Sequence, residues 1–433
     1  MTIIAILLFL ILLFITRQTH IDASSKKMLN MFVIYWFISI ILASLRVYDI
    51  FKVSIYTYAL VFIGVFSFSF GFLIVAKKRN NCLEITKEDI SSQVIRLSGN
   101  IFYRIMMVLA SIYIYSLLVI FFNKILLYGS LASVRTEFYA AELYGPLFGQ
   151  INAFFLRPLY LITLPVFAYL LLYKRNWFCL LLGFYLFGYE SLGGGRIGYV
   201  RIIVGIIFVA YCLLNTFKNK KRFGYTIIII GAVLIFGLLS IVSAARQGEV
   251  GLDSSTRRSG AETTSKHIIS YTACPIVAFD HSIEYDYKGL LGGYQYGNLT
   301  FTPVLGSVNL FSSRFGMTIP LKLNELIEYK QNIPIDISPD MDWNALYTAN
   351  LYYYLDFGLF GIILFPFLFG LLISGLITKL YKYKSLPLVM IVSYCLWCML
   401  DSVLDNAFHS PYDFLFLMIL YFLGTRNIYL RRQ

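Results

Sequence analysis

The sequence predicts an all-α membrane protein whose helices cross the bilayer about eleven times. Of its 433 residues, 59% are hydrophobic and 14% are charged, whereas an ordinary soluble domain carries about 25% charged residues. Apolar runs of roughly 17 to 25 residues recur along nearly the whole chain, and about 20 such residues carry a helix across the hydrocarbon core. The apolar surface of this chain therefore needs lipid as its solvent, and the sequence leaves no room for a separate soluble enzyme domain.

The predicted spans follow the apolar runs in order. The first run, residues 2–16, has no basic residue before it and no small-residue cleavage site after it, which favours a retained helix over a signal peptide. The predicted spans are residues 2–16, 28–46, 53–76, 101–127, 151–173, 177–192, 197–217, 223–245, 346–378, 385–405 and 411–427.

Basic residues set the expected orientation of the chain. They collect in every second connection, as in residues 77–79, 218–222 and 379–384. The positive-inside rule places these connections in the cytoplasm, which gives a periplasmic N-terminus and a cytoplasmic C-terminus. The formal net charge of +13 is then explained by anchors of membrane topology, so we expect no nucleic-acid partner.

The spans are expected to form one integrated membrane domain with a large outer loop. Residues 1–245 hold transmembrane helices one to eight, residues 246–345 form the periplasmic loop, and residues 346–433 hold the last three helices and the cytoplasmic C-terminus. Apolar stretches at 268–279 and 299–311 predict short helices at the membrane interface. A loop of this length usually has a function. The first half of the chain has no loop of similar size, which argues against a transporter built from inverted repeats.

Charged residues inside the spans are predicted to lie in the outer half of the membrane. One such charge at the bilayer centre costs about 2.5 to 3.5 kcal/mol by insertion scales, so its position reports either function or pairing. In the structural interpretation, these side chains extend to interfacial water or form ion pairs with one another, for example Glu190 with Arg196 or Arg201. An outward-facing polar cavity explains the set better, because only Arg104 lies near an inner end. The outer residues are Arg157, Glu190, Arg196, Arg201, Arg246, Asp356, Asp401 and Asp405.

The turn Ser191-Leu192-Gly193-Gly194-Gly195-Arg196 joins two spans on the predicted outer face. Its three glycines allow backbone amides to approach an anion, and the following helix start adds a favourable dipole. Arg196 could then clamp a phosphate with two parallel hydrogen bonds. A tight interhelical turn requires glycine as well, so both interpretations of this segment stay open.

The sequence predicts no metal site and no cofactor. Cys395 and Cys398 form a CxxC in apolar surroundings, where packing is the favoured role. His267 and His281 lie in the outer loop without the spacing of zinc ligands.

Three features of the sequence resemble the bacterial oligosaccharide repeat-unit polymerases, the Wzy-type O-antigen polymerase family. They are the SLGGGR turn at 191–196, the large outer loop, and residues 348–370, TANLYYYLDFGLFGIILFPFLFG, with their DFG step. The layout of spans extends the likeness over essentially the whole chain. The resemblance implies a glycosyltransferase C-type membrane fold in the bacterial plasma (inner) membrane. It also implies two kinds of partner, undecaprenyl-pyrophosphate-linked glycans and a protein that regulates chain length.

The resemblance implies transfer of a growing glycan from undecaprenyl pyrophosphate to the terminal sugar of a lipid-linked repeat unit, on the outer face of the membrane. Cations must meet the charge of the departing diphosphate, a role that suits arginine. The arginine candidates are Arg196, Arg246, Arg157, Arg201, Arg135 and Arg314. The candidates for the catalytic base are Glu142, His281, Glu190 and Asp253.

Three other functions remain as alternatives. An O-antigen ligase would share the donor lipid and the arginine chemistry but would transfer the glycan to lipid A core. A lipid-linked oligosaccharide flippase or other transporter needs charges along the whole path, and the one-sided distribution argues against it. A scaffold of a polysaccharide assembly complex would leave the intramembrane arginines without a role.

Overall fold

The computed structural model describes most of the chain. The described residues are 21–77, 87–129, 143–173, 177–192, 197–209, 260–332, 335–339, 341–343, 346–406, 408 and 410–426, together with 6, 9, 10, 12, 134, 137 and 138.

Five helices in the described part are long and apolar enough to cross a membrane. The prediction of an all-α membrane protein is confirmed at this level. The five are Ala23–Ser44 (α2), Ile55–Ala76 within α3 (Ile55–Lys77), Ile101–Tyr128 (α5), Leu147–Tyr173, which joins α7 (Pro146–Ile151), η2 (Asn152–Leu156) and α8 (Arg157–Tyr173), and Ala349–Tyr383 (α16).

Four more predicted spans coincide with helices of 12 to 16 described residues. Residues 210–217 of the span predicted at 197–217 lie outside the described residues. A helix of 15 or 16 residues is only about 24 Å long, less than the roughly 30 Å of the hydrocarbon core. The spans predicted at 2–16 and 223–245 lie outside the described residues, apart from four positions in the first of them. The four shorter helices are α9 (Trp177–Ser191), α10 (Ile197–Phe208), α17 (Leu386–Asp401) and α18 (Pro411–Arg426).

The described helices group into two compact units. The first unit holds α2, α3, α16, most of α18 and the elements of the predicted outer loop from residue 266 on, and the second holds α4 (Lys87–Gly99), α5 and α7 to α10. Helix α17 gives its first part to the second unit and its last part to the first. The amphipathic helix α4 was not predicted.

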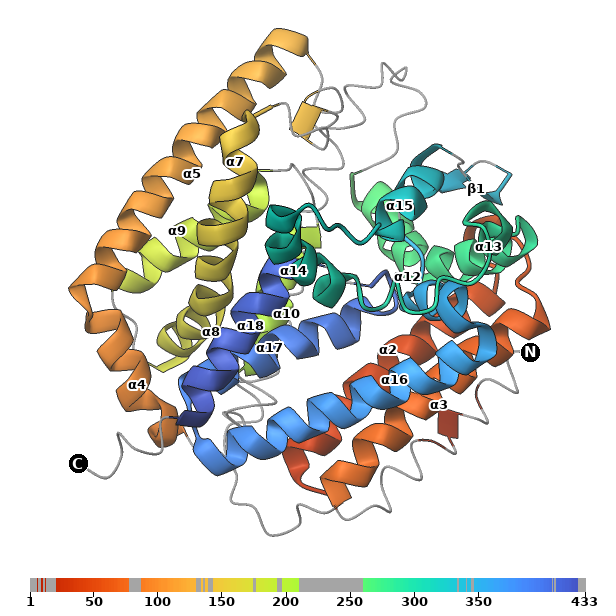
Figure 1. Ribbon diagram of the computed structural model, residues 1–433, viewed down its shortest axis with the longest axis horizontal. Coiled ribbons are helices and arrows are strands. Elements are labelled where there is room, and N and C mark those ends of the chain that lie inside the picture. Colours follow the sequence, from red (N-terminus) through yellow and green to blue (C-terminus); the bar gives the residue numbers. More distant parts are fainter. Residues whose placement is uncertain are drawn as a thin grey trace. The chain divides into compact units, whose positions relative to one another are not determined.

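In the first unit, α2, α3 and α16 run side by side (Figure 1). Two glycines let the backbones of α3 and α16 approach closely. A Cβ atom at Gly71 would lie 2.2 Å from the carbonyl oxygen of Phe367, and one at Gly370 would lie 2.3 Å from that of Phe68. Small residues at such crossings are the usual means of packing membrane helices, because van der Waals contact replaces the hydrophobic effect in lipid.

The predicted outer loop folds into a group of elements within the first unit. Helix α12 has 25 residues, so the expectation of short helices was wrong for this segment. Its residues 273–280 are all buried, and because eight consecutive residues make more than two turns, this part of the helix is covered on every side. The remaining elements are α13 (Tyr287–Leu290), α14 (Thr302–Ser312), η4 (Ser313–Phe315), α15 (Lys322–Asn332) and the antiparallel strands β1 (Ile335–Ser338) and β2 (Met341–Trp343).

In the second unit, α9 packs against both α5 and α8. Tyr185 is fully buried there, and its hydroxyl donates to the carbonyl oxygen of Leu156 at 2.6 Å. Arg104 on α5 donates to the carbonyl oxygen of Ser98 at 2.7 Å, and its guanidinium lies over the rings of Trp177 and Phe178. Its aliphatic stem and its partners thus hold Arg104 at one end of α5.

Candidate functional site

Charged side chains come together at the adjacent ends of α9 and α10 in the second unit. The guanidinium of Arg201 lies 3.3 Å from the carboxylate of Glu190, and the two side chains are 33% and 10% exposed. The sequence offered this ion pair as one of two interpretations of Glu190, and the structure forms it. A carboxylate so little exposed needs a nearby cation, because its desolvation is otherwise costly.

Gly198 leaves the space that the Glu190 side chain occupies. A Cβ atom at Gly198 would lie 2.0 Å from Oε2 of Glu190, so no larger residue fits there without moving the carboxylate. The Tyr160 hydroxyl is buried and lies near enough to interact electrostatically with both Glu190 and Arg201. The pair therefore lies next to a buried hydroxyl group.

Further polar contacts surround this pair. The Ser191 hydroxyl and the Tyr199 hydroxyl are 2.8 Å apart, and the Tyr189 hydroxyl donates to Oδ1 of Asn152 at 2.9 Å. Asn152 opens the π-helical turn η2, and Arg157 is the half-buried residue that follows it. Such π turns occur often at functional sites, since they redirect the side chains after them. We refer to Asn152, Tyr160, Glu190, Gly198 and Arg201 as the Glu190 cluster.

In the first unit, a buried carboxylate fastens the segment before α14 to α16. Asp356 is fully buried, and its two carboxylate oxygens accept from the amides of Leu299 and Thr300 at 3.1 and 2.7 Å. The carbonyl oxygens of Leu355 and Asp356 accept from the amides of Gln295 and Tyr296 at 3.0 and 3.1 Å. Asp356 thus has a structural role that the sequence did not indicate.

The other two residues of the DFG step also meet this part of the loop. Phe357 and Gly358 leave the helical conformation, and Gly358 has φ 60° and ψ −140°, a region that only glycine enters freely. The ring of Phe357 lies edge-on to Tyr296, with centroids 5.9 Å apart. A Cβ atom at Gly358 would lie 2.9 Å from the Tyr294 hydroxyl. All three residues therefore contact the segment 294–300.

A buried lysine joins α15 to the connection between α17 and α18. The Lys330 ammonium, whose side chain is 5% exposed, lies 3.4 Å from the Asp405 carboxylate and 3.2 Å from the Tyr352 hydroxyl. Tyr352 donates to the same carboxylate at 2.5 Å, and the ammonium also lies over the ring of Tyr347. Lys330 was not among the predicted site residues, because nothing in the sequence on either side of it indicates that its side chain is buried.

Asp280 holds the start of α3 from a distant element. Its carboxylate accepts from the Ser54 amide at 2.8 Å, the Ser54 hydroxyl at 2.5 Å and the Thr57 hydroxyl at 2.6 Å. The Ser54 hydroxyl also accepts from the Thr57 amide at 3.2 Å, so Asp280 fixes the residue that caps α3. The signal in the sequence was a single acidic residue closing the apolar stretch 273–279, and it was missed.

The remaining described candidates lie apart from the Glu190 cluster in the sequence. His281 Nδ1 lies 3.3 Å from the carboxylate of Glu284, and its ring contacts those of Phe51 and Tyr285. Arg314 is exposed on η4. Five candidates lie outside the described residues, namely Arg135, Glu142, Arg196, Arg246 and Asp253.

The described cysteines are buried. Cys395 and Cys398 are buried free thiols. Burial also raises the pKa of the Cys274 thiol to about 12, so it stays protonated and is a poor nucleophile at neutral pH. Within the described residues, no group of three or more His, Cys, Asp or Glu side chains could hold a metal ion.

Comparison with protein-family models, with curated proteins and with solved structures finds no match to this chain. The site is therefore interpreted from its own geometry.

Proposed function

We propose that this protein is a membrane glycosyltransferase that joins undecaprenyl-pyrophosphate-linked oligosaccharide repeat units on the outer face of the bacterial plasma membrane. The observation that carries the proposal is the Glu190–Arg201 pair in the two helices that flank the SLGGGR turn. A half-buried cation near the predicted glycine turn, which carries an arginine of its own, is suited to a diphosphate at the membrane surface.

The reaction is a direct displacement at the anomeric carbon of the donor. The acceptor hydroxyl oxygen forms the new bond to this carbon while the bond from the carbon to the diphosphate oxygen breaks. The diphosphate leaves with the electron pair, and its charge is met by Arg201, with Arg157 and Arg196 as further cations. Glu190 holds the Arg201 guanidinium in position, so the proton of the acceptor goes to another base, with Glu142 and His281 as the candidates.

Gene deletion and complementation in the host test this proposal. The surface polysaccharide is separated on a gel after complementation with wild type, Arg201→Gln or Arg196→Ala, at matched membrane levels of protein. Deletion is expected to collapse the ladder to single repeat units, and only wild type is expected to restore it. Arg104→Gln is the matched control, since this arginine lies at the predicted inner end of α5 and should support a full ladder.

Other outcomes separate the alternatives. If deletion removes every surface-attached unit while lipid-linked polymer accumulates, the protein is a ligase that shares the same donor chemistry. An unchanged ladder after deletion would exclude both the polymerase and the ligase. If Arg201→Gln and Arg104→Gln restore the ladder equally well, the assignment as a polymerase is retained, but the Glu190 cluster is not its donor site.

A further inference from the structure

The loop segment 293–301 of the first unit displays aromatic rings to solvent. Tyr296 is 76% exposed and Tyr294 is 39% exposed. Both belong to the stretch that contacts the DFG step of α16, through Phe357 and Gly358. Large apolar rings that stay exposed beside polar groups commonly mark a binding surface.

The backbone beneath these rings is firmly held. The amides of residues 295 and 296 donate to carbonyl oxygens of α16, and the Asp356 carboxylate accepts from the two amides that precede α14. Tyr296 has a φ of 50°, which is unusual for a bulky residue and persists only where the surroundings fix it. The exposed rings are therefore preorganised rather than carried by a loose loop.

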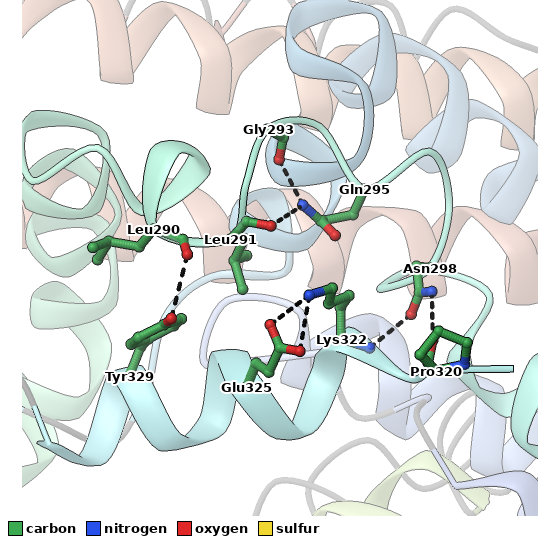
Figure 2. A network of polar contacts seen from close by, with 9 residues as sticks. All are labelled: Leu290, Leu291, Gly293, Gln295, Asn298, Pro320, Lys322, Glu325 and Tyr329. Atoms are coloured by element: carbon green, nitrogen blue, oxygen red, sulfur yellow. Dashed lines mark hydrogen bonds and ion pairs between the residues drawn. The ribbon is translucent and has the colours of Figure 1, made fainter.

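Side chains of the loop add a second set of restraints, which Figure 2 shows. Gln295 donates to the carbonyl oxygens of Leu291 and Gly293 at 3.0 and 2.6 Å. Asn298 donates to the carbonyl oxygen of Pro320 and accepts from the Lys322 amide, both at 2.8 Å. These bonds tie the segment to the start of α15 on its other side.

The chemistry around the rings is mixed. The Lys288 ammonium lies 5.0 Å from the centre of the Tyr294 ring, and Asp286 precedes Lys288 by two residues in the sequence. A sugar ring offers an apolar C–H face and a rim of hydroxyl groups. Flat tyrosine rings that carry phenol groups and have an ammonium group nearby complement both parts of such a ligand.

We propose that Tyr294 and Tyr296, fixed on the DFG step of α16, form a stacking platform for the sugar rings of a glycan. This inference rests on the proposed function, because it assigns the platform to the oligosaccharide that the enzyme holds during polymerisation. The loss of binding on removing one ring is expected to be about tenfold, which corresponds to about 1.4 kcal/mol of ring contact.

A series at one position tests the platform. Tyr296→Phe keeps the flat ring, Tyr296→Leu keeps apolar area without a ring, and Tyr296→Ala removes both. In the deletion host, at matched protein levels, Phe is expected to retain the ladder. Leu and Ala are expected to reduce its long chains about tenfold. Tyr128→Leu is the matched control, since this tyrosine is also exposed and lies at the end of α5.

Each outcome of the series bears on the platform. If Leu performs as well as Phe while Ala fails, the residue contacts lipid at the membrane interface and the glycan platform is wrong. If all three variants support a normal ladder, the platform is likewise excluded.

A binding measurement keeps the inference separate from the proposed function. Repeat-unit oligosaccharide released from the host polysaccharide is titrated against the purified full chain in nanodiscs. Binding that falls about tenfold in Tyr296→Leu but not in Tyr296→Phe supports the platform even where deletion leaves the ladder unchanged, in which case only the polymerase assignment fails. Equal binding by both variants overturns the platform whatever the ladder shows.

Discussion

At the scale of single residues, Gly198 is the sharpest test of the Glu190 cluster. An alanine normally stabilises a helix interior by about 0.5 to 1 kcal/mol relative to glycine. Here its Cβ would lie 2.0 Å from a carboxylate oxygen and 2.7 Å from Cβ of Glu190, so the whole side chain must leave the position in which it pairs with Arg201. We predict that Gly198→Ala loses most of the ladder while the protein remains in the membrane at wild-type amounts.

The control for this substitution is Gly149→Ala on α7, where an added Cβ meets no atom within 4 Å. It should give a full ladder and equal or greater thermal stability. A full ladder from Gly198→Ala as well would mean that the position of the Glu190 carboxylate does not matter for activity.

The sequence anticipated some of these residue contacts and missed others for a physical reason. Glu190 and Arg201 are 11 positions apart, on helices joined by a short turn, so their pairing could be considered from the sequence. Lys330 and Asp405 are 75 positions apart, and Asp280 and Ser54 are 226 apart. Contacts of that range depend on how the helices pack, which periodicity and composition do not specify.

At the scale of elements, the contact between α15 and the connection after α17 depends on Lys330. Breaking a buried ion pair by removing one partner costs about 3 to 5 kcal/mol, and the Asp405 side chain is 23% exposed. We therefore expect Lys330→Met to lower the free energy of unfolding by about 3 kcal/mol or less. This loss would appear as a drop of several degrees in the melting temperature of the purified protein.

A double variant identifies the cause of that loss. Lys330→Met combined with Asp405→Asn removes both charges, so it should recover part of the stability lost by Lys330→Met alone. If the two single effects simply add, the ion pair is not what fastens α15, and the ring contacts with Tyr347 and Tyr352 account for the effect.

Element boundaries were predictable where the apolar pattern ended at a strong signal. The span predicted at 101–127 matches α5, which Asn100 caps at its start and Gly129 ends with a φ of 65°. The outer loop was less predictable. Residues 268–279 read as a short interfacial helix, but they belong to α12, which begins at Gly260 and is buried over its second half. The apolar stretch alone did not show that the helix continues toward Gly260 on one side and to Glu284 on the other.

At the scale of the whole molecule, composition predicted the membrane environment because it sums over hundreds of residues. Five of the eleven predicted spans are long apolar helices in the described part of the chain. The orientation of those helices remains a prediction from the basic connections. Lys382 belongs to a connection expected in the cytoplasm, and Phe315, 78% exposed, belongs to the loop expected in the periplasm.

Cysteine labelling in intact cells tests that orientation. A small membrane-impermeant maleimide should label Phe315→Cys in intact cells and Lys382→Cys only after the membrane is opened. The described native cysteines should add little background, because all four are buried, and burial holds the pKa of Cys274 at about 12, so that its thiol is protonated at the labelling pH. Wild type carries that background and is the control. Labelling of Lys382→Cys in intact cells, with Phe315→Cys protected, would show that the chain has the opposite orientation in the membrane. The Glu190 cluster would then lie on the cytoplasmic side, where the proposed polymerisation could not use it.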